Sequence, residues 1–173
     1  MTGLSSEIRA GDMAASSPAL RPGTIDDLEG CNAVIEAAVS TWPLPERVKR
    51  LSLPIYRYDA HDLEHLALLV AEEPGRGIVG VAAWEPAHPE DVPQGKKGLL
   101  LHGIYVVPDG QRSGIGTSLI AAAADAALVA GFDGVLVKAH PSAEGFFEAR
   151  GLEPLPVLDA HRDYAHRFWL PLQ

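Results

Sequence analysis

The sequence has 173 residues, of which 47% are hydrophobic and 21% are charged, a composition typical of a globular domain and not of a disordered chain. Its formal net charge is −9, so it lacks the excess of basic residues that is typical of a nucleic-acid-binding protein. The negative electrostatic potential of such a chain favours neutral or cationic partners. The single cysteine, Cys31, excludes an internal disulfide and a cysteine-based zinc site.

The first residues are small and polar, and they lack the apolar run of a secretory signal peptide. No stretch approaches the roughly 20 apolar residues that would span a bilayer. We therefore expect a cytoplasmic protein that binds neither membrane nor nucleic acid. Residues 1–18 are predicted to form a flexible tail and residues 19–173 a single domain, because no repeat or long linker divides them.

Hydrophobic periodicity and turn residues predict alternating strands and helices within this domain. In chain order, the pattern predicts a strand at 19–21, a helix at 28–39, helical pieces within 44–66, strands at 66–71, 78–84 and 99–107, a helix at 117–130, a strand at 135–137, a helix at 141–150 and a strand at 164–170. Thr24 offers an N-cap to the first helix, and Gly131 and Gly151 mark the ends of the last two. This order predicts a mixed α/β domain.

The most informative segment joins the strand at 99–107 to the alanine-rich helix. It reads DGQRSGIG over residues 109–116, a polar turn with glycines at a helix start. A helix start exposes backbone N–H groups and the positive end of the helix dipole, and glycines let a phosphate approach the backbone closely. Gln111 and Arg112 add donors for phosphate oxygens. The segment therefore predicts an anion-binding turn, although a tight turn that only needs glycines would show the same pattern.

Spacing excludes two familiar phosphate sites at this turn. It has neither the P-loop pattern G-x-x-x-x-G-K-[ST] nor a full G-x-G-x-x-G with a following ribose-binding acid. A phosphate-recognising α/β protein of another kind remains an alternative.

Two stretches together resemble the GNAT superfamily of N-acetyltransferases. The strand end Ile104-Tyr105-Val106-Val107-Pro108, followed by Gln111-x-x-Gly114-x-Gly116, is similar to the acyl-CoA pyrophosphate loop of that family. Further along, residues 140–152 (HPSAEGFFEARGL) are similar to the family pattern N-x-x-A-x-x-F-Y-x-x-x-G-F. The resemblance covers roughly residues 20–173, and it implies a mixed, mostly antiparallel central sheet flanked by helices in a single domain.

The resemblance implies acetyl-CoA as co-substrate, with no metal, and it places the coenzyme residue by residue. Backbone N–H groups of the turn would hold the pyrophosphate, and the strand before the turn would bind the pantetheine arm where it splays from the strand at 135–138. The implied binding residues are Ile104, Tyr105, Val106, Gln111, Arg112, Ser113, Gly114, Ile115, Gly116, Thr117, His140 and Phe147.

The implied reaction is attack of a neutral amine on the thioester carbonyl, which needs a base, an oxyanion donor and a proton for the leaving thiolate. The resemblance assigns the oxyanion donor to the backbone N–H of Val106. Phe147 stands where the family often has the tyrosine that protonates the thiolate, and His140 stands where it has asparagine. Because Phe147 has no hydroxyl, His140, Tyr164 or water would take that role.

The motifs do not assign the base. Alternation along the strand places His102 on the same face as Ile104 and Val106 unless a bulge intervenes, so His102 is the first candidate. Glu85, at the end of the preceding strand, is the second. The alternatives without a catalytic role are that His102 is a half-buried structural histidine and that Glu85 is an exposed carboxylate at the end of a strand.

Other conspicuous side chains have weaker functional interpretations. Four aromatic residues are candidates for an acceptor pocket or for ordinary packing: Trp42, Tyr56, Tyr58 and Trp84. The polar cluster at 59–65 lacks metal-ligand spacing and is predicted to be a solvated helix face. Cys31 is predicted to be a small buried hydrophobe, and His161 and His166 are predicted to be structural.

The sequence therefore predicts an N-acetyltransferase that transfers an acetyl group from acetyl-CoA to a primary amine of a small molecule or a protein, by direct attack in a ternary complex. No acyl-enzyme is expected, because no cysteine or serine stands beside a base. A degenerate acyl-CoA-binding module with a sensing or scaffold role is the alternative, motivated by Phe147. The excess of acidic over basic residues favours cationic acceptors such as polyamines or amino sugars. A homodimer paired through the closing strand is a further expectation.

Overall fold

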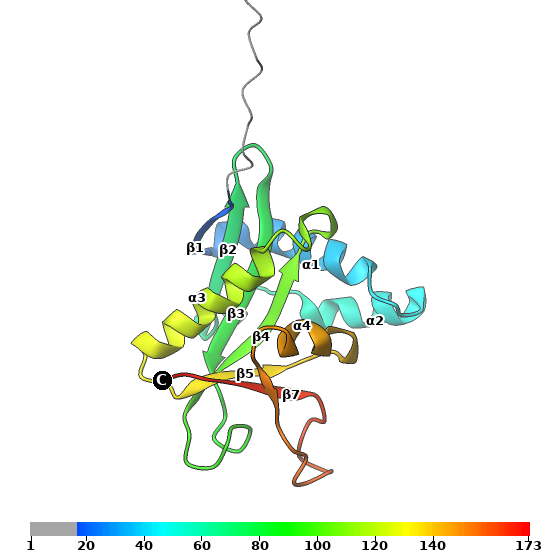
Figure 1. The fold of residues 1–173 in the computed structure, drawn as a ribbon. Coiled ribbons are helices and arrows are strands. Elements are labelled where there is room, and N and C mark those ends of the chain that lie inside the picture. The colour runs from blue at the N-terminus through cyan, green and yellow to red at the C-terminus, as the bar shows by residue number, and fades with distance from the viewer. Residues whose placement is uncertain (1–16) are drawn as a thin grey trace, which may run out of the picture.

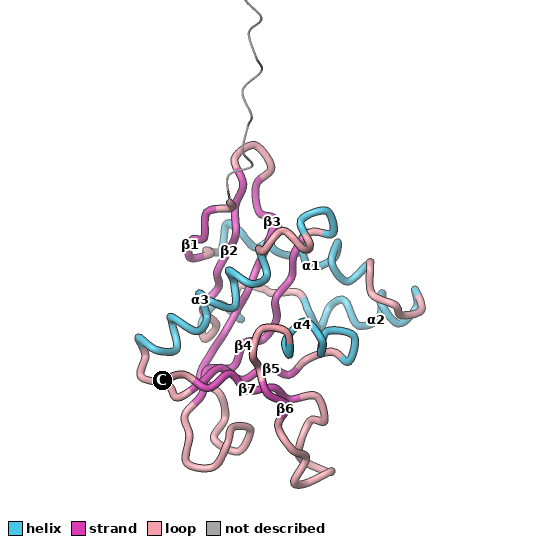
Figure 2. The backbone as a smooth tube through the Cα atoms, in the orientation of Figure 1, coloured by secondary structure: helices cyan, strands magenta, loops and turns pink. Residues whose placement is uncertain are grey.

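The computed structural model describes residues 17–173, so the predicted tail at residues 1–18 lies almost wholly outside the described residues. A seven-stranded sheet in the order β1-β2-β3-β4-β5-β7-β6 crosses the domain, with α1 and α2 on one face and α3 and α4 on the other (Figures 1 and 2). Every pairing is antiparallel except that of β4 with β5. The predicted fold class, a mostly antiparallel sheet flanked by helices, is confirmed.

The strands are β1 (Ala19–Pro22), β2 (Ala67–Glu73), β3 (Gly77–Pro86), β4 (Gly98–Val106), β5 (Gly134–Lys138), β6 (Glu153–Pro154) and β7 (Arg167–Pro171). The helices are α1 (Leu28–Ser40), α2 (Glu46–Tyr56), α3 (Ile115–Val129) and α4 (Glu144–Glu148), with short 3₁₀ turns at Ile25–Asp27, Asp62–Glu64, Pro108–Gly110 and Pro141–Ala143. None of the helices in residues 17–173 has the length and hydropathy of a membrane-spanning segment.

Most predicted elements are present, and the differences have local causes. The segment 44–66 contains α2 and the 3₁₀ turn at Asp62–Glu64, as the predicted helical pieces require, and α2 ends two residues after Pro54, which lacks an N–H donor. The last strand begins at Arg167 and not at 164, and the Tyr164 hydroxyl donates to the carbonyl of Ala139 at 2.9 Å. The two-residue strand β6 was not predicted, because it is too short to show a period.

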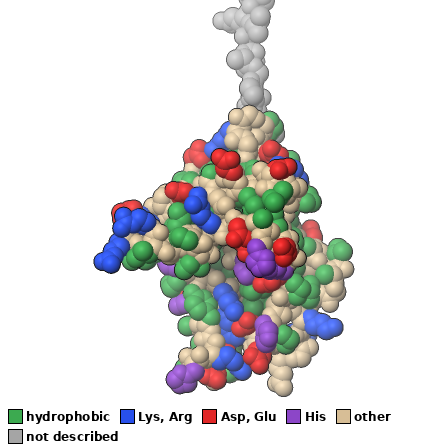
Figure 3. Space-filling model, turned by 180° about the vertical axis from the view of Figure 1, so that it is seen from behind, with side chains coloured by type: hydrophobic (Ala, Val, Ile, Leu, Met, Phe, Trp, Pro, Cys, Tyr) green, Lys and Arg blue, Asp and Glu red, His purple; other side chains and the backbone are tan. Residues whose placement is uncertain are grey.

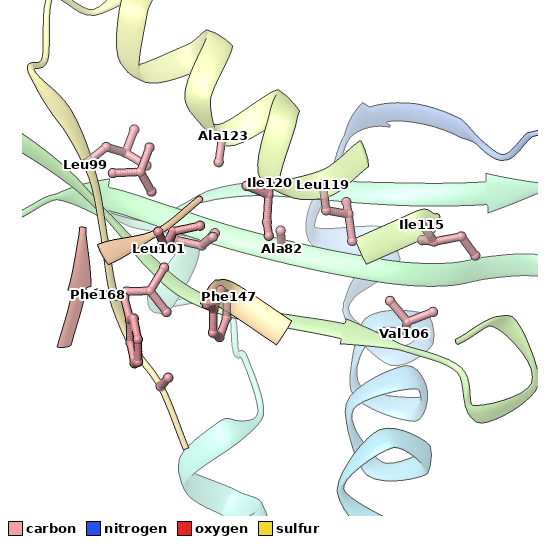
Figure 4. Packing of buried hydrophobic residues seen from close by; sticks show 14 of the residues in the cluster. Ala82, Leu99, Leu101, Val106, Ile115, Leu119, Ile120, Ala123, Phe147 and Phe168 are labelled. Carbon is pink, nitrogen blue, oxygen red and sulfur yellow. The ribbon is translucent and has the colours of Figure 1, made fainter. Parts of the chain in front are cut away.

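Two apolar clusters hold the helices against opposite faces of the sheet. The buried stripe of α1, from Cys31 to Val39, packs on Val70 and Val81. On the other face, α3 and α4 pack on β3, β4 and β5, and Figure 4 shows Leu101, Phe147 and Phe168 close together in this cluster. Fully burying one such side chain contributes roughly 1.5–3 kcal/mol. Cys31 is buried as predicted, and burial raises the pKa of its thiol to about 11.

The strands β4 and β5 separate after a short parallel pairing. The pairing runs from Gly98 opposite Gly134 to Leu101 opposite Val137. β4 then continues to Val106 alongside β3, whereas β5 ends at Lys138 alongside β7. The predicted splay between these strands is therefore present, and it leaves an opening on the β5 side of β4.

A β-bulge interrupts β4 at His102. Trp84 of β3 lies opposite Leu101, and Ala83 lies opposite Gly103, so His102 stands opposite no residue of β3. The bulge shifts the alternation by one position, so that Leu101 and Ile104 both contact the α3-side cluster. The prediction that His102 shares a face with Ile104 and Val106 was therefore wrong, and the bulge is the reason.

The closing strand β7 has a neighbour on each side. β5 pairs with it along its whole length, and β6 pairs with Phe168 and Trp169 on its other edge. The partner that we had expected from a second subunit is thus supplied within the chain at these positions. The homodimer itself remains a prediction.

Two glycines allow β4 and β5 to meet. A Cβ at Gly134 would lie 2.2 Å from the ring of Trp169, and a Cβ at Gly98 would lie 2.8 Å from the same ring. We expect Gly134→Ala to lower the free energy of unfolding by roughly 1–3 kcal/mol through overpacking, measured by urea denaturation.

The matched control is Gly145→Ala in α4, where an added Cβ would meet no atom within 4 Å. This variant should keep or slightly increase the stability, because alanine favours a helix over glycine by roughly 0.5–1 kcal/mol. Equal destabilisation by both substitutions would contradict the proposed role of Trp169.

Candidate functional site

The polar turn after β4 has an unusual backbone conformation. Arg112 adopts a φ of 64°, in the left-handed region that few non-glycine residues occupy. Gly114 follows with a φ of 89° and forms the N-cap of α3. Left-handed residues in a turn can direct successive N–H groups to one side, which is the geometry of anion-binding nests.

The N–H groups of residues 112–117 donate to no acceptor within residues 17–173. The groups on either side do have partners: the N–H of Gln111 donates to Pro108, and that of Ser118 donates to Gly114 at 3.0 Å. The N–H groups of Ile115, Gly116 and Thr117 belong to the first turn of α3, where the helix dipole is positive. The predicted anion-binding turn therefore has a continuous run of donors for an anion with several oxygens.

The two glycines of this turn are required for different reasons. Gly114 has open space around it, but its positive φ favours glycine. Gly116 has an ordinary φ, but a Cβ there would lie 3.0 Å from the ring of Phe146. Gly116 therefore also lets α4 pack against the start of α3, a reason that the sequence motif does not show.

Arg150 was not among the predicted site residues. Its Nε donates to Oγ1 of Thr117 at 2.9 Å, and its guanidinium lies 3.6 Å from the centre of the Phe146 ring. This places a positive charge beside the first turn of α3. The spacing of Phe146 and Arg150, four residues apart near the end of a predicted helix, is the sequence signal that indicated a contact between them.

A partly open cleft of about 170 Å³ occupies the opening between β4 and β5. Residues of β4, β5, α2, α4 and the connecting loops form its walls: Trp42, Tyr56, Leu101, His102, Gly103, Ile104, Tyr105, Val137, Lys138, Ala139, His140, Ala143, Phe147 and Tyr164.

The edge of β4 presents backbone groups to this cleft. The N–H of Val107 donates to Val79, so Val107 and every second residue before it hydrogen-bond to β3. Ile104 and Val106 are the intervening residues, and their N–H and C=O groups therefore point away from β3, toward the side from which β5 has diverged. The edge thus has donors and acceptors for a ligand that carries amides.

His102 and Glu85 form a close pair at the cleft. Nε2 of His102 lies 2.6 Å from Oε1 of Glu85, and the two side chains are 35% and 31% exposed. Glu85 follows Val81 and Ala83 by alternation on β3, so the pair lies on the sheet face that carries α1 and α2. The structure therefore brings the two predicted base candidates together, but on the face opposite to the one we expected.

His140 has a local structural role in addition to lining the cleft. Its Nδ1 accepts the N–H of Ser142 at 3.2 Å and caps the following 3₁₀ turn, and it lies 2.7 Å from Oγ of Ser142. Since Nδ1 is an acceptor, the neutral ring carries its proton on Nε2. The ring stacks on Trp42 with centroids 5.1 Å apart.

Phe147 and Tyr164 lie on different parts of the wall. Phe147 is buried and stacks on Phe168, so it contributes only apolar surface. The hydroxyl of Tyr164 donates to the carbonyl of Ala139, and partial burial raises the pKa of this phenol. Tyr164 is therefore one of three tyrosines that line the cleft within the described residues, with Tyr56 and Tyr105.

The four aromatic candidates divide into two pairs. Trp42 and Tyr56 line the cleft, with their rings in an edge-to-face contact at 5.1 Å. Tyr58 and Trp84 are not part of its lining within the described residues, and they pack against the clusters on the two sheet faces. The pocket interpretation thus applies to the first pair, and the packing interpretation to the second.

The polar cluster at 59–65 forms a capped turn. Oδ1 of Asp59 accepts hydrogen bonds from the N–H groups of His61 and Asp62, at the start of the 3₁₀ turn Asp62–Glu64.

Residues 17–173 contain no group of three or more histidine, cysteine, aspartate or glutamate side chains arranged to hold a metal ion. His166 pairs with Glu144 in a short contact, and His161 is exposed.

The chain matches one protein-family model, and its fold matches solved structures. Residues 31–152 match the model described as the acetyltransferase (GNAT) family. A GCN5-related N-acetyltransferase from Rhodopseudomonas palustris is 24% identical with a TM-score of 0.71, over 94% of this chain and 100% of that one. A search of the curated proteins gave no match.

Two further solved structures have the same fold and contain the coenzyme. A GNAT family acetyltransferase from Brucella melitensis, in complex with acetyl-CoA, is 21% identical with a TM-score of 0.61, over 90% of this chain and 88% of that one. The PaiA N-acetyltransferase from Thermoplasma acidophilum, in complex with coenzyme A, is 15% identical with a TM-score of 0.68, over 91% of this chain and 100% of that one. At these identities the likeness shows the fold alone.

The turn at 112–117 is expected to bind inorganic pyrophosphate. Excess pyrophosphate should raise the melting temperature of the full chain, because an anion held by the folded turn stabilises only the folded state. Ser113→Asp should abolish this shift by placing a carboxylate among the N–H groups. Gln94→Asp adds the same charge in an exposed loop and should keep the shift. Equal shifts in the two variants would show that the anion binds elsewhere.

Proposed function

Because the chain belongs to the GNAT acetyltransferase family, we propose that it transfers an acetyl group from acetyl-CoA to a primary amine, by direct attack within a ternary complex. One observation carries the proposal. The run of N–H donors at 112–117 begins a few residues after the β4 edge whose backbone groups face the cleft. A diphosphate and an amide-bearing arm can therefore be bound along one continuous path.

The residues present fit coenzyme A at each part of that path. The backbone N–H groups of 112–117 would hold the diphosphate, with Gln111 and Arg150 as further donors. The backbone groups of Ile104 and Val106 that face the cleft would pair with the amides of the pantetheine arm, as an added strand would, whereas the backbone of Tyr105 between them hydrogen-bonds to β3. Phe147 would form the apolar wall beside the arm.

The proposed step forms a nitrogen–carbon bond and breaks a carbon–sulfur bond. The amine nitrogen attacks the thioester carbonyl, and the backbone N–H of Val106 stabilises the oxyanion of the tetrahedral intermediate. Collapse of the intermediate expels the thiolate. The products are the acetylated amine and the thiol form of coenzyme A, so one proton must leave the nitrogen and one must reach the sulfur.

His102 is the proposed base. If its Nε2 carries the proton donated to Glu85, its Nδ1 has a lone pair available to take the proton from the amine. Glu85 would then be a positioning residue that selects this tautomer and stabilises the imidazolium. The bulge supports this role, because it removes His102 from the β3–β4 ladder.

The proton for the sulfur has three candidate sources in this chain: Nε2–H of His140, the hydroxyl of Tyr164, or water. His140→Asn separates the two roles of His140, since asparagine can keep the cap on Ser142 but cannot act as an acid. We expect this variant to lower kcat by no more than about tenfold, because a thiolate with a pKa near 8.5 leaves with little help. Tyr164→Phe, measured in the same way, tests the second source. A loss of a hundredfold or more in either variant would show an essential acid.

Phe147 motivates a second candidate function, an acyl-CoA-binding module with a sensing or scaffold role. Release of coenzyme A thiol from acetyl-CoA, measured with and without a panel of primary amines, separates the two. Amine-dependent release supports the transferase. Binding of acetyl-CoA by calorimetry without release for any amine would support the module.

The base assignment has its own test. His102→Ala should lower kcat/KM roughly 100-fold and remove the acidic limb of the pH profile, because a protonated imidazole cannot accept a proton from the amine. His88→Ala is the control, since His88 is another exposed histidine beside a glutamate, in a loop away from the cleft lining. A pH profile unchanged by His102→Ala would dismiss His102 as the base.

A further inference from the structure

The cleft wall toward α1 and α2 is built from aromatic rings. Trp42 contacts Tyr56 edge to face and stacks on His140, each with centroids 5.1 Å apart. The ring of Tyr56 lies 6.5 Å from that of Tyr105, centroid to centroid. These rings come from the loop after α1, the end of α2, the loop after β5, and β4. They form one continuous surface for a flat apolar group.

The charged groups around this surface already have partners. The carboxylate of Glu85 is bonded to His102, and Lys138, which lines the cleft, is bonded to Asp91 at 2.9 Å. His166, whose ring lies against that of Tyr164, is paired with Glu144. None of the residues that line the cleft in the described chain is a carboxylate. An acceptor with a second ammonium group would therefore place it without a counter-charge.

Three polar atoms of this wall, the hydroxyls of Tyr105 and Tyr56 and Nε1 of Trp42, form no side-chain hydrogen bond within residues 17–173, and the hydroxyl of Tyr105 belongs to the most buried of these residues. Tyr105 is only 7% exposed, and its hydroxyl forms no hydrogen bond with residues 17–173 although the residue lines the cleft. Its ring folds back over Gly103, where an added Cβ would lie 2.6 Å from the ring. Burial raises the pKa of this phenol well above its usual range, so it is neutral and can donate or accept.

The overall acidity of the chain does not extend into the cleft. The cleft lining within residues 17–173 contains no aspartate or glutamate, and Figure 3, which shows the molecule from behind, has acidic and basic side chains interspersed with apolar ones on that face. The net charge of −9 therefore says little about the acceptor. Polyamines and amino sugars, which the composition favoured, are disfavoured by the aromatic and carboxylate-poor lining.

We propose, on the basis of the acetyltransferase function above, that the acceptor is an arylalkylamine: a primary amine on a flat aromatic body with no second charge. Trp42 and Tyr56 provide the surface for the aromatic body, and the hydroxyl of Tyr105 binds a polar group of the acceptor. The amine then faces His102, which takes one of the two protons of the nitrogen. Selection against diamines comes from the cost of burying a second ammonium group without a partner.

The test compares kcat/KM, measured by thiol release, for phenethylamine, hexylamine, hexamethylenediamine and spermidine. Hexylamine matches the diamine in length and differs in one charge, and phenethylamine differs from hexylamine in its flat ring. We expect phenethylamine to exceed hexylamine by roughly three- to tenfold. Hexylamine should exceed the diamine by about tenfold or more.

Variants show whether the named residues cause these preferences. Trp42→Leu should bring the ratio of kcat/KM for phenethylamine to that for hexylamine close to one. Tyr105→Phe should raise KM roughly three- to tenfold for tyramine, whose ring carries a hydroxyl that Tyr105 can bind, and should raise KM for phenethylamine less. Tyr58→Phe is the matched control, because Tyr58 is a partly buried tyrosine of the same cluster that does not line the cleft, and it should leave KM unchanged.

The outcomes separate this proposal from the proposed function. Faster turnover of the diamine or spermidine, or a ratio that Trp42→Leu does not change, would overturn the arylalkylamine assignment while the acetyltransferase function stands. If no amine is turned over, the proposed function fails. Calorimetric titration of phenethylamine and of the diamine into the protein with coenzyme A then tests the arylalkylamine assignment. The assignment requires that phenethylamine binds more tightly than the diamine and that Trp42→Leu weakens the binding of phenethylamine.

Discussion

The candidate site depends on the length of one strand pairing. β4 and β5 are parallel neighbours from Gly98 and Gly134 to Leu101 and Val137, and no further. Each strand has an antiparallel partner on its other side, β3 for β4 and β7 for β5, so the sheet continues although the two strands separate. Backbone groups of β4 beyond the separation are left without ladder partners, and such groups must be satisfied by other polar atoms. An opening of this kind can be kept in a stable fold when water or a ligand bearing amides completes the hydrogen bonding.

The bulge at His102 reconciles two requirements on β4. Leu99 and Leu101 at its start, and Ile104 and Val106 at its end, all contact the α3-side cluster. Strict alternation cannot place all four on one face, because residues of one face lie an even number of positions apart, whereas Leu101 and Ile104 lie three positions apart. One extra residue in β4 places all four on the same face, and His102 is the residue that has no partner in the β3–β4 ladder. The same strand therefore keeps its core contacts and presents a titratable group to the cleft.

The fold class and most elements follow from periodicity and turn residues, because helices and strands with one buried face show their period in the sequence. The anion-binding turn was also predictable, since a glycine such as Gly114 at the start of a helix that follows a strand lets an anion approach the exposed N–H groups of the first helical turn. The bulge was not, because residues 99–106 are almost all apolar and show no clear alternation. The contact of Arg150 with Thr117 was missed for another reason: the two residues lie 33 positions apart, and local sequence does not encode where such distant segments meet. The same holds for the division of the aromatic residues, since lining a cleft depends on where distant segments meet.

Net charge and site charge are separate quantities in this protein. The chain carries 23 acidic residues against 14 basic ones, yet carboxylates that border the cleft, such as Glu85 and Asp91, are each held by a cationic or titratable side chain. A carboxylate committed to one partner contributes little attraction for a second cation, and the field of distant surface charges falls off over about 10 Å at ordinary salt. Under the proposed function, the acceptor would be selected by the groups that line this cleft, which are the aromatic surface, the Tyr105 hydroxyl and the His102–Glu85 pair. For this reason the local lining is a better guide to the acceptor than the composition of the chain.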